Sequence, residues 1–276
     1  AFLTVFGLVF WYFSSILASP RGGPNGPYYR IKAFYKEPKN SLDVVYIGTS
    51  VFDRSISPLT IWEEQGFTSF VRATPAQNPI VMYYYLRETL QYQQPKVVVL
   101  GASILFNDRS VDGLEGLTRL AVDPLRMSKT KLQLIWQLVS RSEKQSLVSY
   151  IFPLFRYHSR WNELTRNDFV KNQKLDLSLL KGFMPVYGYP REPIQDDYLG
   201  MAQTQAELNS LSSQYLQAAI ALCRENGVEP VLLVTPRSDW TYAKYLAVSA
   251  FAREQGVTYI DYNLPDNLSK LGLDLE

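Results

Sequence analysis

The sequence predicts an α/β fold, a doubly wound, flavodoxin-like parallel sheet of about five strands with a helical insertion and an N-terminal transmembrane helix. Three observations lead to this prediction. Short β-branched runs alternate with helical segments over residues 44–100, and the alternation returns over residues 204–261. The chain has 276 residues, which suits one sizeable α/β domain plus an anchor. Units as short as these favour parallel βαβ pairing.

The N-terminal segment AFLTVFGLVFWYFSSILA carries no charged residue. As a helix it would span about 27 Å, close to the thickness of a bilayer core. We expect residues 1–19 to form a transmembrane signal anchor and the Pro- and Gly-rich residues 20–41 to form a juxtamembrane linker. A cleaved signal peptide is the alternative. If cleavage followed Ala18, position −3 would be Ile16, where a signal-peptide cleavage site requires a small residue. The first residue is Ala rather than Met, so we expect further residues upstream.

The elements of the domain over residues 42–276 follow from periodicity and from cap and breaker residues. The expected strands are 44–47, 68–71, 97–100, 231–234 and 258–261. The expected helices are 58–66, 78–91, 129–139, 144–155, 204–226 and 240–255. For the first of them, Ser57 is the expected N-cap and Pro58 the first helical residue.

The alternation of strands and helices breaks over residues 103–200, and we interpret this stretch as an insertion. Its later part, residues 181–199, is punctuated by Pro and Gly and carries several aromatic residues. Such an insertion forms a cap over the strand ends. It either shapes a substrate groove or only stabilises the domain.

Composition narrows the classes of function. The formal net charge of +2 gives no reason to expect a nucleic-acid partner. One cysteine, Cys223, excludes an intramolecular disulfide, and its apolar helical run predicts a buried thiol. With His158 as the only histidine, we expect no metal site. No glycine-rich nucleotide motif is present, and we expect no cofactor.

Ser50 is the candidate nucleophile. The strand at 44–47 leads into Gly48-Thr49-Ser50, and the next helix is expected only from Ser57-Pro58. Ser50 would thus lie just beyond the carboxyl end of a strand, where open α/β sheets bind ligands. Gly48 permits a sharp turn there. A Gly-x-Ser sequence alone is also typical of a plain turn.

Three ordered segments, GTSVFDRSISPLTIWEEQGFTSF, ATPAQNPIVMYYYLRETLQYQQPKVVVL and FRYHSRWNEL, together resemble a bacterial membrane-anchored branch of the SGNH/GDSL hydrolase superfamily. The resemblance runs from about Leu42 to the end of the chain. Relatives include proteins that accompany membrane-bound O-acyltransferases in acylating cell-wall polymers and exopolysaccharides. The resemblance implies that Ser50 acts in an ester-cleaving or acyl-transferring site. It also implies an acylated polysaccharide or wall polymer as substrate and a membrane-bound O-acyltransferase as partner.

The resemblance also implies a single-pass protein of the bacterial cell membrane whose globular domain lies outside the cytoplasm. The positive-inside tendency favours the opposite orientation, because basic residues closely follow the apolar segment. These residues are Arg21, Arg30, Lys32, Lys36 and Lys39.

Further site residues follow from the resemblance. Ala73 stands where these hydrolases place a glycine whose N–H faces the oxyanion, and Gln77 and Asn78 are the nearest side-chain amides. Asn78 is equally suited to cap a helix. In FRYHSRW, His158 would contact substrate or take a packing position, and Arg160 could bind an anionic group.

Arg237 directly follows a predicted strand, so it would contact a ligand or lie on the surface.

SGNH hydrolases take their base from an Asp-x-x-His pair beyond the last strand, and this sequence has no such pair. Two hypotheses follow. In the first, residues beyond Glu276 supply the pair, and the protein is an esterase or O-acyltransferase. In the second, the protein is a catalytically inactive member of the same fold that binds a glycan or a membrane acyltransferase partner.

Overall fold

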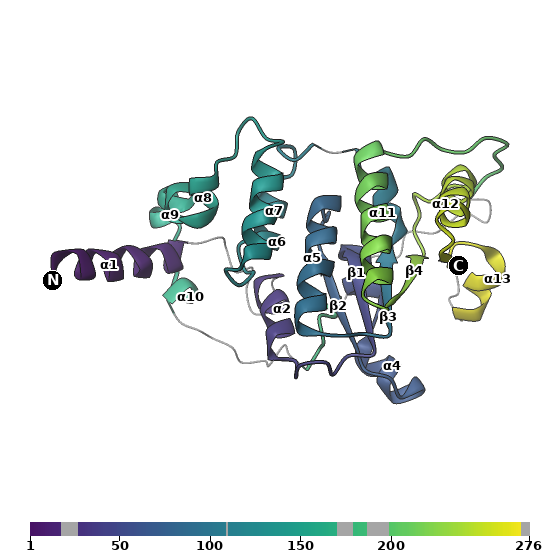
Figure 1. Cartoon of the computed structure of the whole chain (residues 1–276), viewed down its shortest axis with the longest axis horizontal. Helices are drawn as coiled ribbons and strands as arrows, with labels where there is room; N and C mark the ends of the chain where they lie inside the picture. The colour runs from purple at the N-terminus through teal and green to yellow at the C-terminus, as the bar shows by residue number, and fades with distance from the viewer. Residues whose placement is uncertain (18–26, 109, 170–178, 187–198, 272–276) are drawn as a thin grey trace.

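The computed structural model describes residues 1–17, 27–108, 110–169, 179–186 and 199–271 (Figure 1). Within this part, five parallel strands form one sheet in the order β2-β1-β3-β4-β5. The strands are β1 (Val44–Thr49), β2 (Ser69–Thr74), β3 (Val97–Gly101), β4 (Glu229–Val234) and β5 (Thr258–Asp261). The order 2-1-3-4-5 is that of flavodoxin-like sheets. The predicted α/β class with a five-stranded parallel sheet is confirmed.

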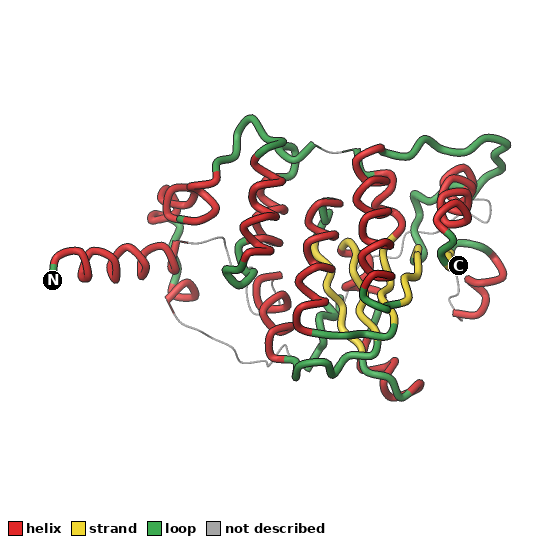
Figure 2. The backbone as a smooth tube through the Cα atoms, in the orientation of Figure 1, coloured by secondary structure: helices red, strands yellow, loops and turns green. Residues whose placement is uncertain are grey.

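Helices cover both faces of the sheet. Successive strand residues point to opposite faces, so each face carries apolar side chains that pack against its own helices. On one face, Ile47, Leu100 and Leu232 join a large core to which α5 (Pro79–Tyr92), α7 (Lys129–Val139), α11 (Ser210–Glu225) and α12 (Tyr242–Gln255) contribute. Figure 2 shows the helices gathered around the central strands. The smaller core of the other face includes Val71, Ala73 and Val99 of the strands and Phe52 of α3 (Ser50–Ser55).

In the part of the insertion that the structure describes, the helical segments lie at 102–169, and most of them are short. They are η2 (Ala102–Phe106), α6 (Glu115–Val122), α7, α8 (Leu147–Ile151), α9 (Leu154–Tyr157), η3 (His158–Asn162) and α10 (Arg166–Phe169). The helix predicted at 144–155 is interrupted at Phe152, the residue before Pro153, as expected for a position that proline disfavours in a helix. Part of the predicted aromatic loop, residues 187–198, lies outside the described residues.

Cap residues account for most of the confirmed helix boundaries. The Ser57 hydroxyl accepts the Thr60 N–H at the start of α4 (Pro58–Gln65), which ends at Gly66 in the left-handed conformation. The prediction for α11 began too early, at residue 204. The helix begins at Ser210 because the side chain of Asn209 caps it by accepting the Ser212 N–H. The chain continues after β5 through α13 (Pro265–Leu268) and η4 (Ser269–Leu271).

The part of the predicted linker that the structure describes, residues 27–41, is helical over residues 27–36 and packs against the domain. This part contains α2 (Pro27–Ala33) and η1 (Phe34–Lys36), and Ile31, Ala33 and Phe34 are buried. The Phe34 ring contacts Phe70 of β2 with centroids 5.5 Å apart. The folded domain therefore begins before residue 42, and residues 20–26 lie outside the described residues.

The N-terminal helix α1 (Phe2–Leu17) projects from one end of the body (Figure 1). Most of its large apolar side chains are exposed, including Phe2 at 78% and Leu3 at 81%. No helix among the described residues is both long and apolar enough to cross a membrane. Cys223 of α11 is a buried free thiol, as predicted, and burial raises its pKa to about 12.

Arg72 of β2 forms a buried ion pair with Glu88 of α5, with Nη2 and Oε2 2.6 Å apart. The guanidinium also donates to the Tyr85 carbonyl and the Thr89 hydroxyl, and it lies over the Phe34 ring. Glu88 accepts a second hydrogen bond from the Tyr35 hydroxyl. This pair thus joins the edge strand, α5 and the N-terminal segment.

We expect Arg72→Ala to lower the free energy of unfolding by about 3–5 kcal/mol, because it leaves the Glu88 carboxylate buried and without its cation. Urea denaturation followed by circular dichroism measures the change. Lys96→Ala is the control, since Lys96 pairs with Asp43 at an exposed position and should cost far less. Equal losses in the two variants would contradict the importance of the buried pair.

Candidate functional site

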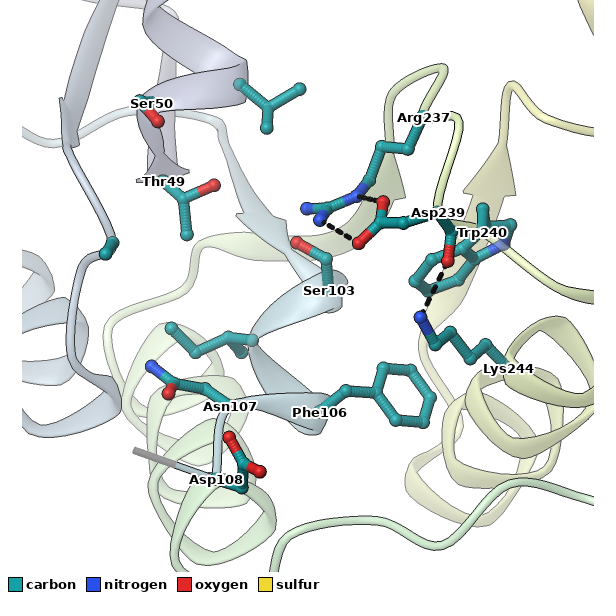
Figure 3. Close-up of a pocket in the computed structure, with 13 residues that line it drawn as sticks. Thr49, Ser50, Ser103, Phe106, Asn107, Asp108, Arg237, Asp239, Trp240 and Lys244 are labelled. Atoms are coloured by element: carbon teal, nitrogen blue, oxygen red, sulfur yellow. Dashed lines mark hydrogen bonds and ion pairs between the residues drawn. The ribbon is translucent and has the colours of Figure 1, made fainter. Parts of the chain in front are cut away.

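A cavity of about 330 Å³ lies at the carboxyl ends of β1, β3 and β4 (Figure 3). In flavodoxin-like sheets the strand order reverses between β1 and β3, and ligands bind at that point. The lining residues come from the end of β1, from the segments that follow β1, β2, β3 and β4, and from α12. They are Thr49, Ser50, Val51, Ala76, Ser103, Ile104, Phe106, Asn107, Asp108, Arg237, Asp239, Trp240 and Lys244.

Ser50 lines this cavity as the first residue of α3, directly after β1. The prediction that no helix begins before residue 57 is therefore wrong. Gly48 makes the abrupt change possible, because a Cβ there would lie 2.9 Å from the Phe52 side chain that folds back over the strand. Ser50 is half-buried, and its hydroxyl has no hydrogen-bond partner among the described residues.

Ser103 is a second serine of the cavity, and it is not among the predicted site residues. Parallel pairing aligns Ile47 with Leu100. The next residues along the two strands are Gly48-Thr49-Ser50 and Gly101-Ala102-Ser103, so the two serines stand at the same register position. The repeated Gly-x-Ser after two predicted strands is the signal that could have identified it. Figure 3 shows the Ser103 hydroxyl directed into the cavity.

The opposite wall of the cavity is charged. Arg237 binds the Asp239 carboxylate through Nε and Nη2, both at 2.8 Å, and these hydrogen bonds lower the pKa of Asp239. The Arg237 backbone N–H donates to Asn263, which holds the turn after β4. Lys244 of α12 donates to the Asp239 carbonyl at 2.7 Å. Trp240 is buried, and its indole N–H donates to Asp261.

The structure thus brings Ser50 and Arg237 together, as their positions after two strands predicted. It also places Asn107 and Asp108 in the cavity. Among the described residues, no three His, Cys, Asp or Glu side chains could together hold a metal ion.

Ala73, Gln77 and Asn78 do not line the cavity. Val71 donates its N–H to the Lys181 carbonyl on the outer side of β2, and N–H groups two residues apart on a strand point the same way. The Ala73 N–H is therefore directed away from β1 and from Ser50. Gln77 is buried and donates to Thr74, and Asn78 caps α5 by accepting the Ile80 N–H at 2.9 Å.

His158 and Arg160 lie outside the cavity. Both belong to η3, in the part of the insertion next to α1 and far from α12 (Figure 1). His158 is exposed, with Nδ1 3.2 Å from the Phe155 carbonyl oxygen. Arg160 binds Asp168 at 3.1 Å and donates to the Leu17 carbonyl at the end of α1. These contacts join the insertion to the N-terminal helix.

Asp53 of α3 connects this helix to α2. Its buried carboxylate pairs with Arg30 of α2, with Oδ2 and Nη1 2.5 Å apart. Burial raises the pKa of Asp53, and the Arg30 guanidinium opposes that rise. The other carboxylate oxygen, Oδ1, is buried without a hydrogen-bond partner among the described residues. The helix that begins with Ser50 is thus tied to the N-terminal segment.

No protein-family model matches this chain, and no curated protein matches it either.

We expect Arg30→Met to destabilise the fold by about 3–5 kcal/mol near neutral pH, because it leaves the Asp53 carboxylate buried without its cation. The pKa of Asp53 then rises further, so the folded state holds a proton that the unfolded state releases, and stability falls as the pH increases. Urea denaturation at pH 5 and pH 7.5 should show the larger loss at pH 7.5. Arg30→Met combined with Asp53→Asn should remove this pH dependence. An equal loss at both pH values would contradict the role of the pair.

Proposed function

We propose that this chain is a serine esterase or O-acyltransferase of the SGNH/GDSL type, anchored in the bacterial cell membrane and acting on an acylated extracytoplasmic glycan or wall polymer. The observation that supports it most is the position of the Ser50 hydroxyl. It lies at the carboxyl end of β1, lines a polar cavity and is engaged by no described side chain. Parallel sheets of this order bind ligands at that place.

In this proposal, the Ser50 oxygen attacks the carbonyl carbon of an acyl ester, and the bond to the alcohol oxygen breaks as the acyl-serine forms. The proton of the Ser50 hydroxyl passes to the departing oxygen, so the alcohol leaves neutral. Water then releases the acyl group as an acid, or a polymer hydroxyl takes it up as a new ester. The candidate donors to the oxyanion are the Ser103 hydroxyl and the backbone amides of Ser50 and Ala76, because these residues line the cavity. Ala76 replaces Ala73 in this role. Arg237, Asp239 and Lys244 provide a charged wall for the polar part of the substrate.

The exposed apolar side chains of α1 support the membrane association. A helix of this kind would hold the domain beside a membrane-bound O-acyltransferase that delivers acyl groups. The resemblance of the sequence to proteins that accompany such enzymes is the reason to propose this partner.

A second candidate function is supported by the position of the only histidine. His158 is exposed on η3 and does not line the cavity, so no imidazole from residues 1–276 reaches Ser50. This finding favours a catalytically inactive SGNH-fold protein whose cavity binds a glycan or a membrane acyltransferase partner. The hydroxyl, amide and charged groups that line the cavity suit a ligand rich in hydroxyl groups.

A fluorophosphonate probe separates the two functions, because it labels only an activated serine. If the chain is an esterase, we expect wild-type protein to be labelled and Ser50→Ala to lose labelling by at least about 10³-fold. Ser55→Ala is the matched control, since Ser55 is in the same helix, does not line the cavity and donates its hydroxyl to the Val51 carbonyl. Labelling is measured by in-gel fluorescence and by mass spectrometry of the modified peptide.

Two outcomes would contradict catalysis by Ser50. Unlabelled wild-type protein would leave the binding function as the better interpretation. Undiminished labelling of Ser50→Ala would assign the reactive hydroxyl to another residue, and Ser103→Ala would then test the nearest one.

A further inference from the structure

A second, larger cavity, of about 800 Å³, lies between α1 and the body of the protein, well away from Ser50. One wall is α1, through Gly7, Phe10, Trp11 and Ser14. The facing wall comes from α2, from η1, from the residues after α6, and from the end of α8 with the residues that follow it. Figure 1 shows this region at the end of the molecule opposite α12. We call this cavity the α1 groove.

The walls of the α1 groove are mostly apolar. The apolar side chains that line it include Phe10, Trp11, Leu125, Ile151, Phe152 and Pro153. Ring contacts hold α1 in place, with Phe10 centroids 5.7 Å from Phe152 and 6.3 Å from Phe155. Trp11 remains 69% exposed. The apolar lining is thus continuous with the exposed apolar surface of α1.

Three cationic side chains, Lys32, Lys36 and Arg126, also line the α1 groove. The Arg126 guanidinium lies 4.4 Å from the Tyr35 ring centroid, and the Lys32 ammonium 4.6 Å from that of Tyr28. Neither Lys32 nor Arg126 forms an ion pair with a carboxylate in the described part of the chain. Two exposed cations are therefore held at the edge of an apolar cavity by aromatic rings.

The other polar groups of the groove do not cancel this charge. Asp123 lines it, but its carboxylate is 6% exposed and is bound by Arg119 and by the Tyr157 hydroxyl. The Ser14 hydroxyl is different, because its oxygen is buried and no described residue bonds to it. The groove thus presents an apolar floor, an unsatisfied hydroxyl and cations at one edge.

We propose that the α1 groove binds one anionic membrane phospholipid. An acyl chain would lie against the apolar wall, the phosphate would contact Lys32 and Arg126, and the Ser14 hydroxyl would bond to an ester oxygen. This amphiphile matches both the apolar lining and the charge, and basic pockets at a membrane surface select anionic head groups in this way. The groove is a site distinct from the cavity of Ser50. It would hold the domain in a fixed orientation on the lipid surface.

Native mass spectrometry tests the proposal on the full chain purified in an uncharged detergent. We expect wild-type protein to retain one phosphatidylglycerol and little phosphatidylcholine. Lys32→Glu combined with Arg126→Glu should weaken phosphatidylglycerol binding by about 30-fold, since each cation contributes about fivefold. Arg253→Glu combined with Lys270→Glu is the charge-matched control, because both residues are exposed on other elements and should leave binding unchanged.

Ser14→Phe is a second, independent variant. It fills the groove while keeping α1 apolar, so lipid retention should be lost although partition into neutral vesicles persists. Equal retention of the two lipids, or unchanged retention by both groove variants, would overturn the proposal. Fluorophosphonate labelling of Ser50 should be the same in all these variants. A failure of the proposed catalysis by Ser50 can therefore be distinguished from a failure of lipid binding in the α1 groove. Circular dichroism and the thermal unfolding midpoint confirm that each variant is folded.

Discussion

The parallel pairing of β1 with β3 is the constraint on which the candidate site depends. Parallel strands that are in register end at the same edge of the sheet, so the residues after Ile47 and Leu100 lie side by side. The next residue of each strand is a glycine, and a Cβ on Gly101 would lie 3.3 Å from the Gly48 Cα atom. The small residues let the chains approach closely before they separate into α3 and η2, and the cavity of Ser50 opens where they separate.

Much of the fold could be predicted because its signals are local. Cap and stop residues such as Ser57 and Gly66 act within a few positions, and β-branched runs mark the strands. α3 was missed because no side chain caps it, so the sequence carries no start signal at Thr49. The segment at 27–36 was assigned to a linker because its burial depends on distant partners such as Phe70. Contacts between residues so far apart cannot be read from local composition.

The candidate site was predictable only where a residue follows a strand. Ser50 and Arg237 meet because the topology of the sheet brings the strand ends together. His158 and Arg160 belong to an insertion whose position is set by contacts with α1, and no strand spacing specifies those contacts. Ser103 follows β3 with the same Gly-x-Ser spacing by which Ser50 follows β1, so this repeated spacing is the one local signal for it.

Residues 181–182, in the later part of the insertion, lie against the edge strand β2. The Lys181 carbonyl accepts the Val71 N–H on the outer side of β2, and Gly182, at φ +87°, lies so close that a Cβ would fall 2.0 Å from the Val71 carbonyl oxygen. An edge strand left open is a template for pairing with another chain. The contact therefore protects the protein against strand-to-strand aggregation at β2. Only a glycine fits there, so this protection depends on a single residue far from the cavity.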